Sequence, residues 1–204
     1  MLKVLIIGDS FAADWSVKYK NYKGWPELLN ENYNVTNLAQ AGVSEYKVYK
    51  QLLSVKNLKE YDWVIVSHTG PYRVATKQHP IHSKDPLHSN ADLILTDIEH
   101  HASKAKNIFN TSLKAATMFY KHHFDQDFYY TTYCLLREKI NEMLKDSKSI
   151  VISNLSDTAR FKYEQIVLNY SELWKKERGL VNHFTAKGNR VIYDDLIQLM
   201  GDAS

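Results

Sequence analysis

The sequence predicts an α/β fold in which helices cover both faces of a parallel sheet. Two observations predict it: short apolar runs rich in β-branched residues recur along the chain, and segments with helical periodicity separate them. A short apolar run without polar alternation is typical of a strand buried on both faces. Since strands and helices alternate, the strands are expected to be parallel and joined by right-handed crossovers.

Four strands are expected. The first run, residues 3–7 (KVLII), is predicted to be a central strand because it is almost entirely apolar and ends at Gly8. Residues 61–68 contain the apolar stretch WVIV, and residues 149–154 read SIVISN. The less apolar segment 33–38 completes the set.

Helices are expected between and after these strands, where apolar residues recur with helical spacing. The second helix follows Pro26, which suits an early helical position because the N–H that proline lacks would have no partner there. The expected helices begin near residue 11 and span residues 27–32, 45–55, 91–101, 103–125, 128–145, 158–178 and 185–200. Residues 70–90 hold three of the four prolines and are expected to form a long loop.

The chain is expected to fold as one domain, residues 1–204, in which residues 70–148 form a loop and a helical insertion. With 44% hydrophobic and 24% charged residues, it can bury a core of ordinary size. The 26 basic and 23 acidic residues give a net charge of +3, too balanced for a nucleic-acid-binding surface. No apolar run is long enough for a membrane span or a signal-peptide core, and the single Cys134 excludes an intramolecular disulfide. A cytoplasmic protein with no nucleic-acid or membrane partner is therefore expected.

Candidate catalytic residues follow the expected strands, because ligands of parallel α/β sheets bind beyond the carboxyl ends of the strands. Ser10 follows the first strand, where its hydroxyl would lie at the sheet edge and its backbone N–H would favour a developing oxyanion. A hydroxyl becomes nucleophilic when a base removes its proton, and the pKa of histidine suits that role near neutrality. His183, just before the last helix, is the best candidate for the base. The alternative role for Ser10 is that of a helix cap.

Three segments carry a resemblance to a known family. Residues 8–11 (GDSF), 37–42 (NLAQAG) and 183–190 (HFTAKGNR) resemble, in this order, the first, second and fifth sequence blocks of the SGNH (GDSL-type) hydrolases. The resemblance implies a flavodoxin-like three-layer α/β/α sandwich and the activity of a serine esterase or lipase.

The resemblance also implies roles for individual residues. Ser10 would be the nucleophile and His183 the base, and the amides of Ser10 and Gly42 would form the oxyanion hole. The family has an aspartate three residues before the histidine, and this chain has Leu180 at that position. We therefore expect a Ser10–His183 dyad rather than a triad. Asn182 is expected to support the imidazole, and a backbone carbonyl of this segment could hold its Nδ1 proton.

The third block of the family differs as well. The family has an asparagine after the third strand whose amide binds the oxyanion, whereas residues 67–73 of this chain read SHTGPYR. Thr69, His68 and Arg73 are candidates to replace it, since each can donate a hydrogen bond. Arg73 could also bind a substrate carboxylate, or it could be a structural cation beside a simple turn. Asp9 is expected to brace the turn that carries the nucleophile.

Eight of the nine histidines fall between residues 68 and 123, among them the pair His79-x-x-His82. Imidazole is a common zinc ligand, but the histidine spacings match no compact ligand signature. The nucleotide-binding patterns GxxxxGK[ST] and GxGxxG do not occur. Neither a metal nor a cofactor is therefore expected.

The expected function is that of a serine esterase that hydrolyses a small acyl ester, such as an acetyl ester, of a carbohydrate or similar metabolite. Its expected partner is accordingly a small-molecule or carbohydrate ester. If a sugar hydroxyl reached the acyl-enzyme before water, the same residues would make an O-acyltransferase. Because the family's aspartate and asparagine are missing, a non-catalytic protein that keeps the fold to bind a ligand or partner is the remaining alternative.

Overall fold

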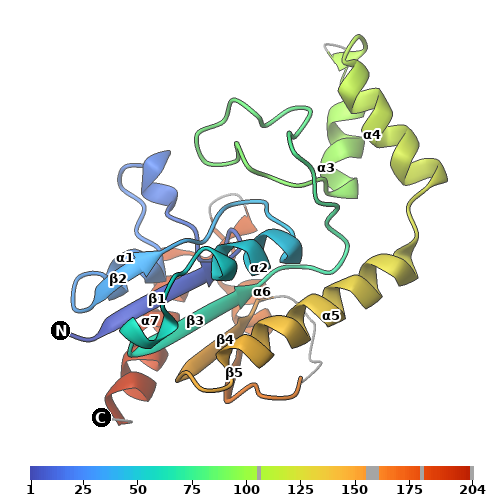
Figure 1. Cartoon of the computed structure of the whole chain (residues 1–204). Helices are drawn as coiled ribbons and strands as arrows, with labels where there is room; N and C mark the ends of the chain where they lie inside the picture. The colour runs from blue at the N-terminus through green and yellow to red at the C-terminus, as the bar shows by residue number, and fades with distance from the viewer. Residues whose placement is uncertain (105–106, 155–160, 180–181, 203–204) are drawn as a thin grey trace.

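The computed structural model describes residues 1–104, 107–154, 161–179 and 182–202. In this part of the chain, five strands form one sheet in the order β2-β1-β3-β4-β5 (Figure 1). They are β1 (Lys3–Gly8), β2 (Asn34–Asn37), β3 (Trp63–His68), β4 (Ser149–Ser153) and β5 (Ile166–Asn169). Every neighbouring pair is parallel, and the order is that of flavodoxin-like folds. The expected parallel sheet is confirmed.

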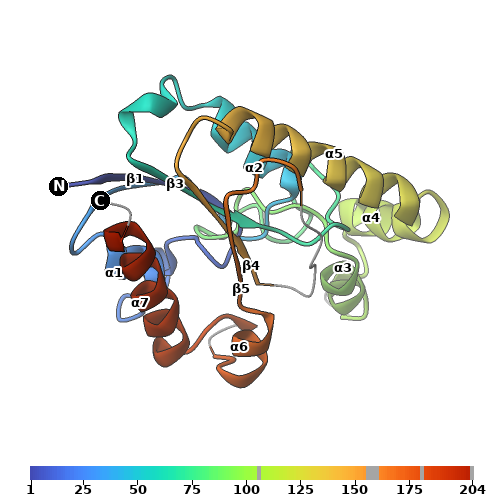
Figure 2. The ribbon, with the colours of Figure 1, turned by 90° about the horizontal axis from the view of Figure 1, so that it is seen from below.

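Helices cover both faces of this sheet, with α1 and α7 on one face and α2 and α5 on the other (Figure 2). The helices are α1 (Trp25–Leu29), α2 (Glu45–Leu53), α3 (Leu95–Ala102), α4 (Thr111–His122), α5 (Gln126–Leu144), α6 (Ser171–Lys176) and α7 (Ala186–Asp202), with 3-10 turns η1 (Trp15–Val17) and η2 (Leu58–Glu60). Among the described residues, no helix is both long and apolar enough to cross a membrane. The three-layer α/β/α arrangement is therefore confirmed.

The central strand β1 contributes to both hydrophobic layers. Val4 and Ile6 pack in the layer that contains residues of α1 and α7, whereas Leu5 and Ile7 pack with residues of α2 and α5. All four side chains are fully buried, which explains why this run shows no polar alternation. Each buried aliphatic side chain contributes about 1.5–3 kcal/mol, so β1 is a major source of stability.

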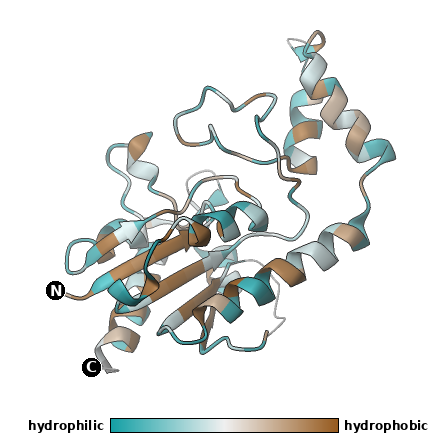
Figure 3. Ribbon diagram, viewed as in Figure 1, coloured by the Kyte–Doolittle hydropathy of each residue, from teal (hydrophilic) through white to brown (hydrophobic). Residues whose placement is uncertain are grey.

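The insertion begins at the carboxyl end of β3. Residues 69–94 form the expected long loop, which one antiparallel bridge between Val74 and Leu93 closes. α3 and α4 then pack against each other around Ile98 and Leu113 and project away from the sheet (Figure 1). In Figure 3 the strands form the main hydrophobic block, and the loop is largely hydrophilic. The insertion thus places a polar loop beside the edge where the candidate site is expected.

Two expected helices are wrong. In the described part of residues 158–178 the chain forms β5 and the short α6 instead of one helix. Residues 166–168 are apolar and pair with β4, and this tertiary pairing outweighs a helical pattern in the sequence. The helix expected from residue 11 is reduced to the 3-10 turn η1, which Asp14 caps.

Candidate active site

The turn after β1 carries Ser10 and is built around Gly8. A Cβ at Gly8 would lie 2.5 Å from Ser67 O, and Gly8 has a φ of +150°, which residues with a side chain rarely adopt. Gln51 holds the same residue from α2: Gly8 N donates to Gln51 Oε1 (2.7 Å), and Gln51 Nε2 donates to Gly8 O (3.1 Å). Ser10, which is 7% exposed, is therefore presented by a turn that is fixed from two sides.

Asp9 is fully buried beside Ser10. Its Oδ1 accepts from Phe11 N (3.1 Å) and from Ser67 Oγ (3.3 Å), and Nη2 of Arg73 lies 3.5 Å from Oδ2. Burial raises the pKa of Asp9 to about 6, against the opposing effects of Arg73 and the hydrogen bonds. These contacts connect the turn to its supports, so the geometry gives Asp9 a positioning role.

The imidazole of His183 packs against the aromatic residues that flank Ser10. Its ring centroid lies 4.2 Å from the ring of Trp15 and 4.8 Å from that of Phe11. Trp15 Nε1 also donates to Ser10 O (2.7 Å), so one indole contacts both the serine and the histidine. The fold thus brings the two residues of the expected dyad to one edge of the sheet, although they lie near opposite ends of the sequence.

A tight loop before α7 presents His183. Gly179 N donates to His183 O (2.6 Å), and Arg178 and Phe184 form an antiparallel bridge. A Cβ at Gly179 would lie only 3.0 Å from Thr185 N, so a residue without a side chain allows the two arms of this loop to approach. The loop is therefore closed by its own backbone.

Asn182 shapes this loop through its backbone, whereas its side chain is exposed. It has a φ of +64°, a conformation that asparagine tolerates better than most residues. Its carbonyl accepts from Trp174 Nε1 (2.6 Å). Asn182 thus contributes to this loop through its backbone, and the support that we expect it to give His183 stays a prediction. Leu180, at the position of the family's aspartate, lies outside the described residues.

The loop after β2 carries Gly42, whose φ of +79° favours glycine. A Cβ at this position would lie 2.8 Å from Ala91 Cβ. Asn37 ties the loop to the turn after β1, because its Nδ2 donates to Ala12 O (2.8 Å) while its Oδ1 accepts from Ala39 N (3.0 Å). The loop that carries Gly42 thus contacts both the turn after β1, through Asn37, and the loop of the insertion.

Glu45, in the first turn of α2, organises the end of β3. Its Oε1 pairs with His68 Nδ1 (2.7 Å), and its Oε2 accepts from Thr69 N (3.3 Å). All three residues are buried. Within the described ranges, Thr69 Oγ1 and His68 Nε2 are buried without a hydrogen-bond partner. Buried polar atoms are rarely left in that state, which makes Thr69 a candidate donor to a bound ligand.

Arg73 links the turn that carries Ser10 to the loop after β2. Its Nη1 donates to Val43 O (2.9 Å), and its Nη2 lies 3.5 Å from Asp9 Oδ2. The side chain is 13% exposed. Because the guanidinium has partners inside the protein, the geometry favours the structural cation over a ligand for a substrate carboxylate.

Sequence reasoning did not assign a role to three residues that support the site: Trp15, Glu45 and Asn154. Asn154 follows β4, and its Nδ2 donates to Ser67 Oγ (3.1 Å), which itself contacts Asp9. Its position directly after an apolar strand was the available signal. Trp15 and Glu45 lie in short helical segments, and nothing in the local pattern indicates their distant partners.

The carboxylate of Asp97 lies among three histidines of the insertion. It lies 3.1 Å from His82 Nε2, 3.4 Å from His79 Nε2 and 3.5 Å from His101 Nε2. His79, His82 and Asp97 are close enough to offer ligands to one ion. His79 Nδ1, however, accepts from the backbone N–H groups of Ile81 and His82 (3.2 Å each), which leaves its proton on Nε2. In that tautomer the Nε2–H of His79 faces the carboxylate of Asp97, and the geometry favours a network of protein groups over a metal centre.

Comparisons with known proteins bear on the fold. No protein-family model matches the chain, and no curated protein matches it. Among solved structures, a lipase/acylhydrolase from Enterococcus faecalis is 11% identical, with 99% of this chain and 97% of that chain covered and a TM-score of 0.52. An acetyl xylan esterase, AlAXEase, is 14% identical, with 97% and 99% covered and a TM-score of 0.40.

The chain has the SGNH hydrolase fold. In this fold the turn with Ser10, the loop with Gly42, the end of β3 with Thr69 and the loop with His183 are linked by the contacts described above. The arrangement offers a hydroxyl, an imidazole and several hydrogen-bond donors within one region, which is the set that acyl transfer through serine requires.

Proposed function

We propose that the protein is a serine esterase that removes a small acyl group, such as acetyl, from a hydroxyl of a carbohydrate. The observation that carries the proposal is the packing of His183 on Trp15 and Phe11, the aromatic residues that flank Ser10. The fold shared with a lipase/acylhydrolase is consistent with this chemistry.

In the proposed reaction, Ser10 Oγ attacks the carbonyl carbon of the ester while His183 takes the hydroxyl proton. The carbonyl oxygen becomes an oxyanion, to which the N–H groups of Ser10 and Gly42 donate. When the tetrahedral intermediate collapses, the alcohol leaves with the proton from His183, and Ser10 remains acylated. Water then attacks the acyl group, His183 transfers a proton from the water to Ser10, and the carboxylic acid is released.

Thr69 is the proposed third donor to the oxyanion, in place of the family's asparagine. Its buried Oγ1, which has no hydrogen-bond partner among the described residues, supports this role. Glu45 accepts from Thr69 N and so holds the residue at the end of β3. The loss of one such donor costs about 10²–10³ in kcat in other serine hydrolases, and we expect an effect in this range for Thr69→Val.

A carbohydrate is the proposed alcohol because of the cavity beside Arg73, which has a volume of about 680 Å³. Its lining includes the rings of Tyr72, Phe124 and Tyr130 and the amide of Gln126. Tyr72 and Tyr130 are 40% and 41% exposed, and their ring centroids lie 6.4 Å apart. Aromatic faces combined with a few hydrogen-bonding groups suit a sugar ring.

Labelling with a fluorophosphonate, together with turnover of 4-nitrophenyl acetate, tests the nucleophile and the base. We expect the native protein to be labelled and active, and Ser10→Ala and His183→Ala to fold but lose both properties. His122→Ala is the matched control, since His122 is exposed on α4. No labelling of the native protein, or undiminished labelling of Ser10→Ala, would overturn the proposal.

An acetylated methyl pyranoside tests the carbohydrate substrate separately. We expect Tyr72→Ala and Tyr130→Ala to raise KM for this ester while leaving turnover of 4-nitrophenyl acetate unchanged, because the small ester does not reach the cavity. Equal effects on both esters would argue against the sugar-binding role of the cavity without affecting the dyad. Transfer of acetyl to an added sugar, in preference to water, would identify an acyltransferase.

A further inference from the structure

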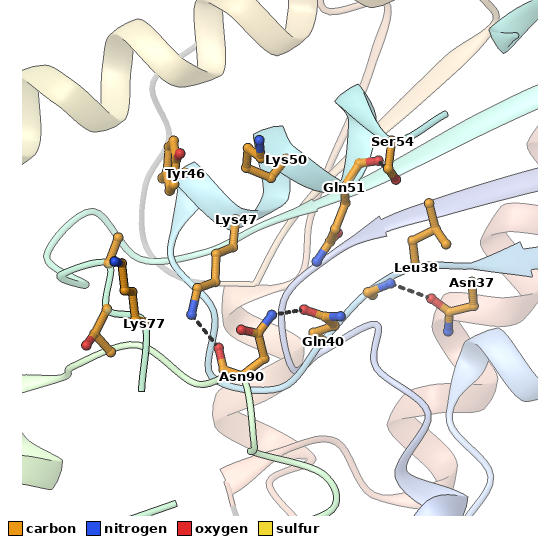
Figure 4. A pocket seen from close by; sticks show the side chains of 13 residues that line it. Asn37, Leu38, Gln40, Tyr46, Lys47, Lys50, Gln51, Ser54, Lys77 and Asn90 are labelled. Carbon is orange, nitrogen blue, oxygen red and sulfur yellow. Dashed lines mark hydrogen bonds between the residues drawn. The ribbon is translucent and has the colours of Figure 1, made fainter. Parts of the chain in front are cut away.

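A second cavity, of about 770 Å³, opens between α2, residues 75–77 and the segment after β2 (Figure 4). Its volume is in the range of small-molecule sites. It shares no lining residue with the cavity proposed for the sugar, and neither Ser10, His183 nor Arg73 lines it. It is therefore a space distinct from the one in which the proposed esterase chemistry would take place.

The lining of this cavity carries an excess of positive charge. Three lysines and no acidic residue line it: Lys47 and Lys50 from α2, and Lys77 from the segment across from that helix (Figure 4). Over the whole chain basic and acidic residues are nearly balanced, at 26 and 23, so this concentration is local. Positive charge on two walls favours an anionic ligand.

One of the three lysines is already paired. Lys47 Nζ lies 2.7 Å from Asp92 Oδ1 and donates to Asn90 O (2.7 Å). The buried Asp92 also accepts from Ser44 N and Thr76 N (2.7 Å each). Through these bonds Asp92 connects the start of α2 to Thr76 on the opposite wall, so contacts within the protein hold the two walls of the cavity in place.

The other two lysines keep their charge available. In the described part of the chain, neither Lys50 nor Lys77 has an ion-pair partner, and both are exposed. Neutral hydrogen-bonding groups lie beside them: the amide of Gln40, which accepts from Asn90 Nδ2 (2.6 Å), and the hydroxyl of Ser54. A ligand with an anionic group and several polar groups would match this lining.

We propose that this cavity binds a phosphorylated small molecule, with its phosphate held between Lys50 and Lys77. A phosphate monoester carries close to two negative charges near neutrality and directs its oxygens toward several sides, so it can meet ammonium groups from two walls. Lysine recognises phosphate as a point charge and needs no planar, bidentate geometry. The amide groups and the hydroxyl then contact the polar remainder of the molecule.

Calorimetry and phosphorus NMR with glucose 6-phosphate test this site on the full chain. We expect the native protein to bind the compound, and Lys50→Glu and Lys77→Glu each to weaken binding by about tenfold or more. Lys114→Glu changes the net charge equally but lies on α4, outside this cavity, and should bind like the native protein. Ser10→Ala should also bind normally, which separates this site from the esterase proposal.

Three results would overturn the proposal. The first is the absence of glucose 6-phosphate binding to the native protein. The second is equal binding by Lys50→Glu, Lys77→Glu and Lys114→Glu, which would show that the two cavity lysines make no specific contact. The third is citrate binding as tight as that of glucose 6-phosphate, which would remove the assignment to phosphate. Because the three substituted lysines are exposed, we expect each lysine variant to fold, and thermal unfolding verifies this.

Discussion

The ring of Trp15 lies 4.2 Å from the imidazole of His183, measured between centroids. The Nε1 of the same indole donates to Ser10 O at 2.7 Å. Phe11 contacts the imidazole as well, with a centroid distance of 4.8 Å. The position of His183 relative to the turn that carries Ser10 is therefore set in part by packing against aromatic rings, although the two residues lie near opposite ends of the chain.

Trp15→Phe tests this link, because it keeps a ring beside His183 but removes the donor to Ser10 O. We expect fluorophosphonate labelling of Ser10 to slow by about tenfold as the turn relaxes. A buried carbonyl that loses its partner also destabilises the fold by about 1–3 kcal/mol. The labelling rate and urea unfolding measure the two effects.

Trp63→Phe is the matched control for this prediction, because Trp63 is also a buried indole but belongs to the core at the start of β3. Its substitution should lower stability without slowing the labelling of Ser10. If Trp15→Phe were labelled as fast as the native protein, the indole would not position the site.

Gly42→Ala tests the loop after β2. The φ of +79° is strained for alanine, and the new Cβ would lie 2.8 Å from Ala91 Cβ. We expect a loss of about 1–3 kcal/mol in stability because of this strain and close contact. We also expect a fall in turnover of 4-nitrophenyl acetate, because the Gly42 amide would move away from the proposed oxyanion. Urea unfolding and initial rates check both.

Two companion variants separate the causes. Ala91→Gly in the same chain should recover part of the stability by removing the close contact, while the strain in φ remains. Gly201→Ala should be neutral, since a Cβ at Gly201 meets no atom within 4 Å. Full activity of Gly42→Ala would argue against an oxyanion role for this amide.

The meeting of Ser10 and His183 at one edge of the sheet could be predicted from the sequence because both residues follow local patterns. Ser10 and Gly8 come directly after a continuous apolar run, and His183 precedes a clear helical segment. Such signals depend on neighbours in the chain. The carboxyl ends of parallel strands meet at one edge, so the local positions were enough to predict that these residues come together.

The parts that could not be predicted depend on contacts between distant segments. Residues 166–169 are too few to show a strand pattern, and their pairing with β4 defines them. Glu45 lies on an amphipathic helix, and its partner His68 is on another element. The spacing of the histidines likewise gives no sign that Asp97 lies among them.

Asp9→Asn tests the buried carboxyl through the pH dependence of stability. Burial raises the pKa of Asp9 from 3.8 to about 6, so the folded protein keeps the proton over a range where the unfolded chain has lost it. The native protein should therefore lose stability as the pH rises through this range. Asparagine does not ionise. We therefore expect the free energy of unfolding of the variant minus that of the native protein to increase by about 2–3 kcal/mol as the pH rises through this range.

Urea unfolding at a series of pH values between about 4 and 7 measures this difference. Asp146→Asn serves as the control, because Asp146 is exposed and its substitution should give a difference that does not change with pH. A constant difference for Asp9→Asn as well would show that Asp9 has an ordinary pKa.

His79→Asn tests the network around Asp97, with the opposite sign. Burial, followed by the neighbouring His82, lowers the pKa of His79 from 6.5 to about 4. The unfolded chain therefore takes up a proton below pH 6.5 that the folded protein accepts only near pH 4, and the native protein loses stability as the pH falls between these values. The effect is as much as about 3 kcal/mol for this residue. Asparagine can still accept from the backbone N–H groups of Ile81 and His82 but does not titrate.

We expect the stability of His79→Asn to fall less steeply than that of the native protein between pH 6.5 and about 4. The slope should not vanish, because burial also lowers the pKa values of His88 and His101. His122→Asn, at an exposed position on α4, should leave the slope unchanged. Thermal unfolding across this range measures all three proteins, and identical slopes for His79→Asn and the native protein would show that His79 is not held neutral by its surroundings.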